Sequence, residues 1–149
     1  HRLLEIVQPD NVYLGQKDYQ QCMVITKLVD LINKQDKINI NICSTLRESD
    51  GLAMSSRNMR LSKEERKIAV TIYKSLSFIR ENITRQNISD LKKQTQAILE
   101  DAGFRVDYVE IAEAENLSPV NTWTENKKTV ALIAAFMNDV RLIDNMLLN

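Results

Sequence analysis

Histidine is nearly missing from this sequence of 149 residues, since His1 is the only one. Ser-His-Asp triads and Cys-His dyads both use a histidine to move a proton, and zinc sites draw on histidine and cysteine ligands. The two cysteines, Cys22 and Cys43, are also too few for a disulfide framework. The composition therefore nearly excludes histidine-dependent hydrolysis. It also excludes a four-ligand zinc site built without carboxylates.

Net charge and long apolar runs are missing as well. Lys plus Arg and Asp plus Glu both number 20, so no overall basic field attracts nucleic acid or an anionic membrane. The longest apolar run extends only from Val130 to Met137, whereas a membrane span needs roughly 20 residues. The apolar and charged fractions, 44% and 27%, are those of a globular protein. We expect a soluble, cytoplasmic protein with no nucleic-acid partner and no membrane partner.

The first third of the sequence has the pattern of an α/β unit. An apolar run predicts a short strand over 12–14, apolar residues three and four apart predict a helix over 18–33, and alternating isoleucines predict a second strand over 38–46. Strand, helix and strand in this order are typical of a parallel sheet, but two strands do not form a stable sheet alone. We therefore expect residues 1–46 to be the end of a larger parallel sheet, in a chain that is part of a longer protein.

The remaining residues, 47–149, predict a separate α+β domain. A polar, aperiodic loop over 46–61 marks the boundary, and Ser62–Glu65 is a capping box that starts a helix of about six turns. Gly103 ends a second helix, and Asn138 with Asp139 predicts a tight turn between the last two strands. The expected elements are helices over 62–83 and 89–102 and strands over 105–112, 129–137 and 140–148.

The segment Gly15–Gln21 is the first candidate site, because it joins a predicted strand to a predicted helix. Open α/β sheets place ligands at such junctions, where the helix N-terminus offers unpaired backbone N–H groups. Lys17 adds a full positive charge, which suits a phosphate or a carboxylate. Asp18 and Gln21 either face a ligand together or form a capping box, and the capping box leaves Lys17 without a role.

The polar loop Arg47–Asn58 is the second candidate site. Ser55 and Ser56 directly precede Arg57, which places two short hydroxyl donors beside a guanidinium fork that matches phosphate oxygens. Gly51 allows the backbone to turn close to a ligand. The alternative is a polar linker between domains, whose serines and arginines have no common function.

Together these segments resemble pantothenate synthetase, the pantoate–β-alanine ligase family. The resemblance covers essentially the whole chain, and the first two site segments are its most specific part. The segments that carry it are Val7–Asp10, Gly15–Gln21, Asp50–Asn58, Arg66–Ala69, Ala102–Phe104, Ala134–Phe136 and Arg141–Asn145.

The resemblance implies a Rossmann-like nucleotidyltransferase sheet, similar to that of class I aminoacyl-tRNA synthetases, followed by a small α+β lid domain with an antiparallel sheet. It implies an enzyme that joins pantoate to β-alanine with ATP and Mg²⁺ through a pantoyl adenylate, and a homodimer. Lys17 and Arg57 are the implied catalytic residues, and Gln21 is the implied pantoate ligand. The implied ATP-binding residues are Gly15, Gln16, Lys17, Asp18, Leu46, Met54, Ser55, Ser56 and Arg57; no protein metal ligand is implied.

Two features of the family are absent from these residues, namely its histidine motif and an upstream Gln of the substrate pocket. The chain resembles the C-terminal portion of the family, and we expect it to make no pantothenate alone. Gln16 and Met54 replace the commoner Glu and Leu without weakening the match. A nucleotide- or anion-binding module without catalysis, and a domain that only mediates association, remain the alternative functions.

Overall fold

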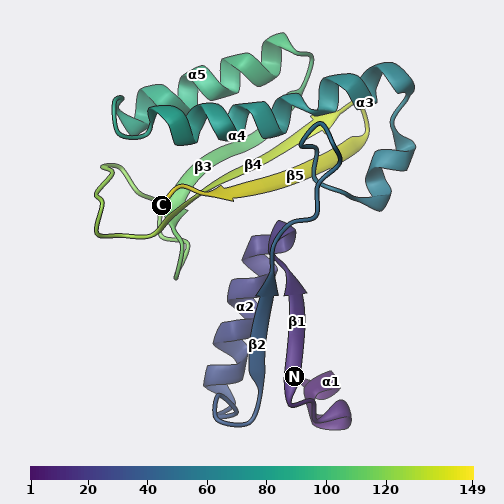
Figure 1. Ribbon diagram of the computed structural model, residues 1–149, viewed down its shortest axis with the longest axis vertical. Helices are drawn as coiled ribbons and strands as arrows, with labels where there is room; N and C mark the ends of the chain where they lie inside the picture. Colours follow the sequence, from purple (N-terminus) through teal and green to yellow (C-terminus); the bar gives the residue numbers. More distant parts are fainter. The chain divides into compact units, whose positions relative to one another are not determined.

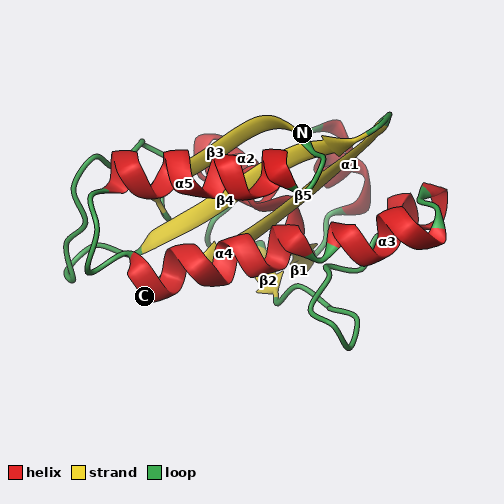
Figure 2. Ribbon diagram, turned by 90° about the horizontal axis from the view of Figure 1, so that it is seen from above, coloured by secondary structure: helices red, strands yellow, loops and turns green.

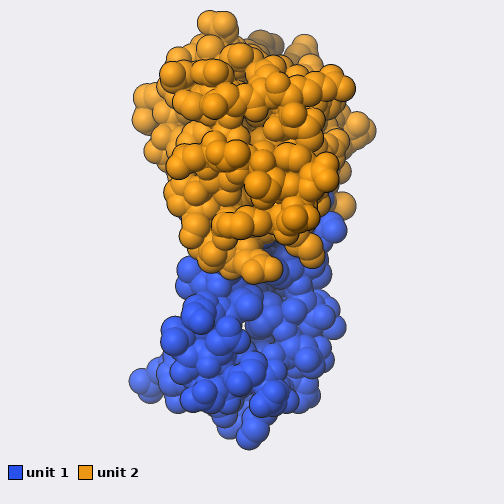
Figure 3. Space-filling view, turned by 90° about the vertical axis from the view of Figure 1, so that its left-hand side faces the viewer, with its two compact units in different colours: residues 1–45 blue, residues 46–149 orange.

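Two parallel strands and the helix between them form the first part of the chain. The computed structural model describes residues 1–149 and divides them into two compact units, residues 1–45 and 46–149, which Figure 3 colours separately. Strands β1 (Asn11–Gly15) and β2 (Asn39–Cys43) pair in parallel, with Val12 opposite Ile40 and Gly15 opposite Cys43. The predicted strand–helix–strand unit is confirmed. The elements of this unit are α1 (Arg2–Val7), β1 (Asn11–Gly15), the 3₁₀ turn η1 (Gln16–Asp18), α2 (Tyr19–Leu31) and β2 (Asn39–Cys43).

The second strand is shorter than the sequence predicts, because it ends at Cys43 rather than at Leu46. Cys43 pairs with Gly15, and the chain leaves β1 directly after Gly15 to form η1, so Ser44 has no partner strand. The division between the units precedes Leu46, whose carbonyl accepts a hydrogen bond from the Met54 N–H at 2.9 Å. Leu46 therefore belongs with the second unit and not at the end of β2.

Many large apolar side chains of residues 1–45 are exposed within this unit. Helix α1 has no buried residue, whereas α2 buries Tyr19, Cys22 and Val29. Exposed apolar faces and open strand edges favour pairing with another chain or segment. The exposed side chains are Leu3, Ile6, Val7, Tyr13, Val24, Leu31 and Ile42.

We predict that the isolated 149-residue chain associates with itself through residues 1–46, or that these residues exchange their amide hydrogens rapidly. Both results follow from apolar surface and strand edges that lack partners. Hydrogen exchange at several protein concentrations, with the mass in solution measured alongside, tests this. Strong protection of Val12–Leu14 and Ile38–Ile42 in a proven monomer, independent of concentration, contradicts it.

An antiparallel sheet covered by two helices forms the second unit. The strand order is β3 (Arg105–Glu113), β4 (Thr129–Met137) and β5 (Val140–Leu147). Helices α4 (Thr71–Asn82) and α5 (Ile88–Asp101) lie side by side on one face of this sheet (Figures 1 and 2). Asn138 and Asp139 form the two-residue connection between β4 and β5, as predicted. The elements are η2 (Ser56–Arg60), α3 (Lys63–Ala69), α4 (Thr71–Asn82), α5 (Ile88–Asp101), β3 (Arg105–Glu113), β4 (Thr129–Met137) and β5 (Val140–Leu147).

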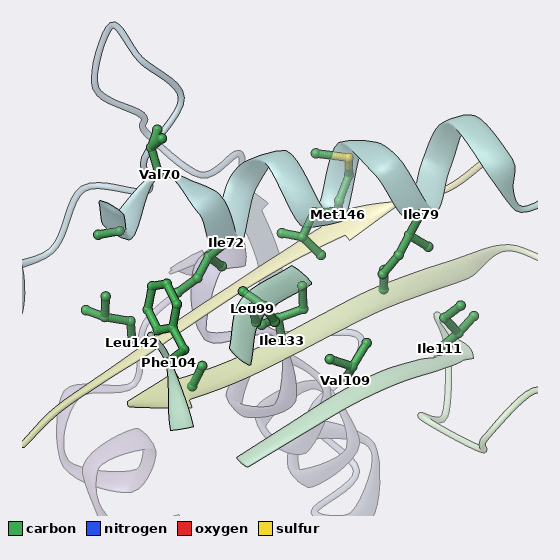
Figure 4. Packing of buried hydrophobic residues seen from close by; sticks show 14 of the residues in the cluster. Val70, Ile72, Ile79, Leu99, Phe104, Val109, Ile111, Ile133, Leu142 and Met146 are labelled. Carbon is green, nitrogen blue, oxygen red and sulfur yellow. The ribbon is translucent and has the colours of Figure 1, made fainter. Parts of the chain in front are cut away.

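The core of this unit lies between the two helices and the sheet. The central strand β4 is buried at every residue except Phe136, as its continuous apolar run predicts. Ile72 and Ile79 of α4 and Leu99 of α5 meet Ile133 of β4 in one cluster (Figure 4). These four side chains are each at most 1% exposed, so the second unit has a hydrophobic core of its own.

The predicted six-turn helix is divided into α3 and α4 at Val70. The capping box at Ser62 and Glu65 is present, as predicted. Helix α3 buries only Ala69 and is held by polar contacts, because Arg66 pairs with Asp50 at 2.8 Å and Glu65 accepts a hydrogen bond from Asn138 in the β4–β5 turn. Helix α4 instead packs on the sheet. Val70, between the two segments, keeps right-handed helical dihedrals, with φ −61° and ψ −18°.

Candidate phosphate-binding segments

The segment Gly15–Gln21 lies at the carboxyl end of β1 and runs through η1 into the N-terminus of α2. Gly15 has an ordinary extended backbone, with φ −76°, and a Cβ there would meet nothing within 4 Å. The Cys22 thiol donates a hydrogen bond to the Gly15 carbonyl at 3.4 Å, and burial raises the pKa of this thiol, which keeps the donor protonated. Lys17 is half-buried in the turn that precedes α2. The segment thus combines a fixed backbone, a helix N-terminus and a cation.

The capping-box interpretation of Asp18 and Gln21 is wrong. Asp18 is the N-cap residue of α2, but its side chain makes no capping hydrogen bond. The 3₁₀ turn gives Asp18 φ −93° and ψ 57°, which is outside the extended conformation of a regular N-cap. Both side chains are exposed, so both remain able to contact a ligand at the start of α2.

The second segment begins with a closed turn over residues 47–53. Arg47 and Ala53 form an antiparallel bridge, and Glu48 N–H donates to the Leu52 carbonyl at 2.8 Å. Met54 follows the bridge directly. The first part of the predicted loop, residues 47–53, is therefore a compact turn.

Ser55, Ser56 and Arg57 form the start of η2, immediately after the turn. The Ser55 hydroxyl accepts a hydrogen bond from Arg57 N–H at 3.2 Å and keeps its own proton for a second partner. Ser56, Arg57 and Met54 are exposed. The Arg57 guanidinium makes one long contact, 3.5 Å from Nη1 to the Arg141 carbonyl. This geometry presents the Ser56 hydroxyl and the Arg57 guanidinium to solvent beside the half-buried Ser55 hydroxyl, which is a suitable donor set for phosphate oxygens.

Gly51 leaves room for the Tyr73 ring, whereas the sequence predicts a role for it in a turn close to a ligand. Its φ is +95°, and a Cβ at this position would lie 2.2 Å from Cδ1 of Tyr73. Leu46, one of the residues implied to bind ATP, is 71% exposed, and its carbonyl accepts a hydrogen bond from Met54 N–H. The Leu46 side chain is therefore accessible to a ligand.

We predict that Gly51→Ala destabilises residues 46–149 by about 1–3 kcal/mol, because the Cβ overlaps the Tyr73 ring and the backbone has positive φ. Trp123 is the only tryptophan, and its fluorescence during urea unfolding reports on this unit. Ser49→Ala, an exposed neighbour in the same turn, is the control and should change stability by less than about 0.5 kcal/mol. Equal midpoints for Gly51→Ala and the wild type would show that the turn tolerates a side chain.

The structure gathers the candidate residues in two groups. Gly15, Gln16, Lys17, Asp18 and Gln21 lie together in residues 1–45. Leu46, Met54, Ser55, Ser56 and Arg57 lie together in residues 46–149.

Arg47 and Asp144 form an ion pair that the sequence reasoning did not assign. The Arg47 guanidinium donates to both carboxylate oxygens of Asp144, at 2.6 and 3.1 Å, and the Asp144 side chain is 3% exposed. The sequence does hint at this pair, because Asp144 lies between Leu142 and Met146 on the same apolar face of a predicted strand. A carboxylate on a buried face requires a partner.

No grouping of three or more His, Cys, Asp or Glu side chains could hold a metal ion in this chain. The Asp50 carboxylate forms an ion pair with Arg66, whose hydrogen bond lowers the pKa of the Asp50 carboxyl.

None of the helices combines the length and apolar character that a membrane crossing requires.

The fold and the two segments define a mixed α/β protein with a two-stranded parallel sheet, a three-stranded antiparallel sheet and groups suited to phosphate. The sequence profile of the family described as Pantoate-beta-alanine ligase matches residues 1–147, and the chain belongs to this family. The matched region includes both candidate segments.

Curated relatives and solved structures agree with this assignment. The pantothenate synthetase of Marinomonas sp. (strain MWYL1) is 45% identical over 148 residues, which is 97% of this chain and 51% of the relative. That of Bacteroides thetaiotaomicron is 39% identical over 146 residues, again 97% of this chain and 51% of the relative. The chain thus spans about half the length of the curated relatives it matches.

The crystal structure of pantothenate synthetase from Thermus thermophilus matches with a TM-score of 0.87 and 35% identity, over 97% of this chain and 52% of that one. The pantoate-beta-alanine ligase from Francisella tularensis, complexed with beta-gamma ATP and beta-alanine, matches with a TM-score of 0.67 and 32% identity. That match covers 98% of this chain and 46% of the other.

Proposed function

We propose that this chain is the triphosphate-binding part of an ATP-dependent ligase that joins pantoate to β-alanine through a pantoyl adenylate. The family match over residues 1–147 carries the proposal, because it includes both candidate segments in a single alignment. We use "complete enzyme" for a protein that contains this chain and also the region that its full-length relatives have and this chain does not cover.

In this proposal residues 1–45 end a Rossmann-like nucleotidyltransferase sheet, and residues 46–149, which include Leu46, form a lid domain. Lys17, at the start of α2, and Arg57, exposed in η2, contact the phosphates of one ATP molecule. Gln21 contacts pantoate. The ATP-binding set also includes Gly15, Gln16, Asp18, Leu46, Met54, Ser55 and Ser56.

The chemistry proposed for these residues is electrostatic. A carboxylate oxygen of pantoate attacks the α-phosphorus of ATP, the bond to the bridging oxygen breaks, and pyrophosphate leaves with the electron pair. Lys17 and Arg57 stabilise the negative charge that grows on the phosphates. The β-alanine amine then attacks the acyl carbon, and AMP leaves. Exclusion of water protects the adenylate, which suits a lid domain.

Magnesium fits this proposal as an ion carried by ATP. Mg²⁺ keeps several waters and binds substrate phosphates in preference to an all-protein cage. The absence of any cluster of three potential ligands is consistent with that mode of binding. When bound, the ion neutralises phosphate charge. We extend the proposal to a cytoplasmic homodimer, for which the exposed apolar side chains of residues 1–45 offer contact surface.

Exchange of labelled pyrophosphate into ATP tests the function. We expect the complete enzyme to catalyse this exchange only when pantoate is present, and without β-alanine, because the adenylate forms reversibly. Exchange that does not depend on pantoate would contradict the proposed substrate. Binding of ATP without any exchange would favour the alternative of a nucleotide-binding module.

A further inference from the structure

We propose that Arg47 and Asp144 are positioning residues, whose ion pair fixes the turn over residues 47–53 on β5 and thereby sets the conformation of Ser55–Arg57. The proposal rests on the proposed function for its consequence in catalysis. Its structural part, a clamp that orders this segment, stands on contacts within residues 46–149.

The clamp itself has a bidentate geometry. Arg47 Nη1 lies 2.6 Å from Asp144 Oδ2, and Nη2 lies 3.1 Å from Oδ1. The same guanidinium donates to the carbonyls of Gly51, at 3.0 Å, and Asn145, at 3.4 Å. One side chain therefore joins the start of the turn and its Gly51 carbonyl to the backbone and side chain of β5. Lysine could not reproduce this fork of donors.

Tyr73 on α4 closes the other side of the turn. The Arg47 guanidinium lies 4.7 Å from the centre of the Tyr73 ring, and the ring is also the surface against which Gly51 packs. Beyond Gly51, the Asp50 carboxylate accepts from Arg66 on α3 and from Leu52 N–H. The turn is thus held by a strand and two helices of the same unit.

The position of Arg57 follows from the turn, since few residues separate them. Ala53 bridges to Arg47, and its carbonyl accepts from Asn58 Nδ2 at 3.0 Å. Met54 N–H donates to Leu46 on the other side of the bridge. Ser55 then starts η2, where Arg57 reaches the carbonyl of Arg141 on β5. Both ends of Met54–Arg57 are therefore attached to elements that the clamp orders.

A buried ion pair is weak evidence for stability, because removing two charges from water offsets much of their attraction. An apolar pair at these positions would pack between α4 and β5 without that penalty. The value of the Arg47–Asp144 pair lies in geometry, because a directional fork fixes one conformation of the turn. The pair therefore acts as a positioning device for the phosphate-binding segment.

Hydrogen exchange on the 149-residue chain tests the clamp without any ligand. In Arg47→Lys, the amides of Glu48 and Met54, which are hydrogen-bonded in the turn, should exchange at least about tenfold faster, while those of Val130–Ala135 in β4 keep their rates. Unchanged rates in the turn overturn the proposal. So does an equal increase in β4, because that result shows general destabilisation. Tyr73→Leu removes the ring under Arg47 and should act in the same direction if Arg47→Lys does not fold.

Glu110→Gln is the matched control. It removes an ion pair of similar length, 2.6 Å to Lys92, that joins α5 to β3 rather than the turn to β5. The turn amides should keep their wild-type exchange rates in this variant. Faster exchange of Glu48 and Met54 in Glu110→Gln would show that any lost ion pair loosens the turn, and would overturn the proposal.

The complete enzyme tests the consequence for catalysis. Arg47→Lys should lower kcat for adenylation about tenfold and leave the KM for pantoate unchanged, because Arg57 is misplaced rather than removed. A loosened turn with an unchanged kcat overturns the link between the clamp and Arg57. If the wild-type enzyme forms no adenylate, the proposed function fails, whereas the exchange result on the clamp still holds.

Discussion

Replacing Arg57 with alanine should slow pantoyl-adenylate formation by the complete enzyme by about 10²–10³-fold, which is typical for the loss of one preorganised charge stabiliser. Arg57 is exposed, and its only hydrogen bond through the side chain is the long one to Arg141. The substitution should therefore leave the unfolding midpoint unchanged. Single-turnover release of pyrophosphate from ATP and pantoate measures the rate of this step.

Arg60→Ala is the matched control for Arg57. Arg60 lies in the same 3₁₀ helix, carries the same charge and is also exposed. If the effect of Arg57 came from the overall charge of this segment, Arg60→Ala would slow adenylation equally. Retention of more than about half of the wild-type rate by Arg57→Ala would remove Arg57 from the proposed phosphate-binding set, because a direct stabiliser has a far larger effect.

Lys17→Ala should produce a loss of the same order, about 10²–10³-fold, because Lys17 combines a full charge with the N-terminus of α2. The loss should appear in the adenylation step and not in the reaction of β-alanine with adenylate that is already formed. Two single-turnover experiments, one starting from ATP and one from isolated adenylate, separate these steps.

Lys27→Ala provides the comparison for Lys17, since Lys27 is an exposed lysine of α2 outside the candidate segment. Its rate should match that of the wild type. The assigned role of Lys17 is wrong if Lys17→Ala keeps more than about half of the wild-type adenylation rate, or if only the second step slows.

The parallel unit could be predicted because its signals are local. The periodic spacing of apolar residues predicts α2, and the alternating isoleucines predict β2; both patterns can be read directly from the sequence. The end of β2 could not be predicted in this way. Cys43 is its last residue because β1 ends at Gly15, and the end of a partner strand is a property of the pairing rather than of residues 44–46.

The residue types were enough to locate the two candidate segments in the sequence. They were not enough to predict the geometry within each segment. The spacing of Asp18 and Gln21 fits a capping box, yet the 3₁₀ turn before α2 removes that contact. Gly51 lies in a polar turn of the kind that binds ligands, but the group that packs against it is the ring of Tyr73, twenty-two positions further along the chain. Contacts of this kind depend on the packing of α4 and β5, which periodicity does not encode.

If residues in both segments bind the phosphates of one ATP molecule, hydrogen exchange on the complete enzyme will distinguish ATP from AMP. We expect ATP with Mg²⁺ to slow exchange both at Gly15–Tyr19 and at Met54–Asn58, whereas AMP, which lacks the β- and γ-phosphates, protects neither segment to that extent. Protection of only one segment by ATP, or equal protection by AMP, would show that the two segments do not share the phosphates of one ATP.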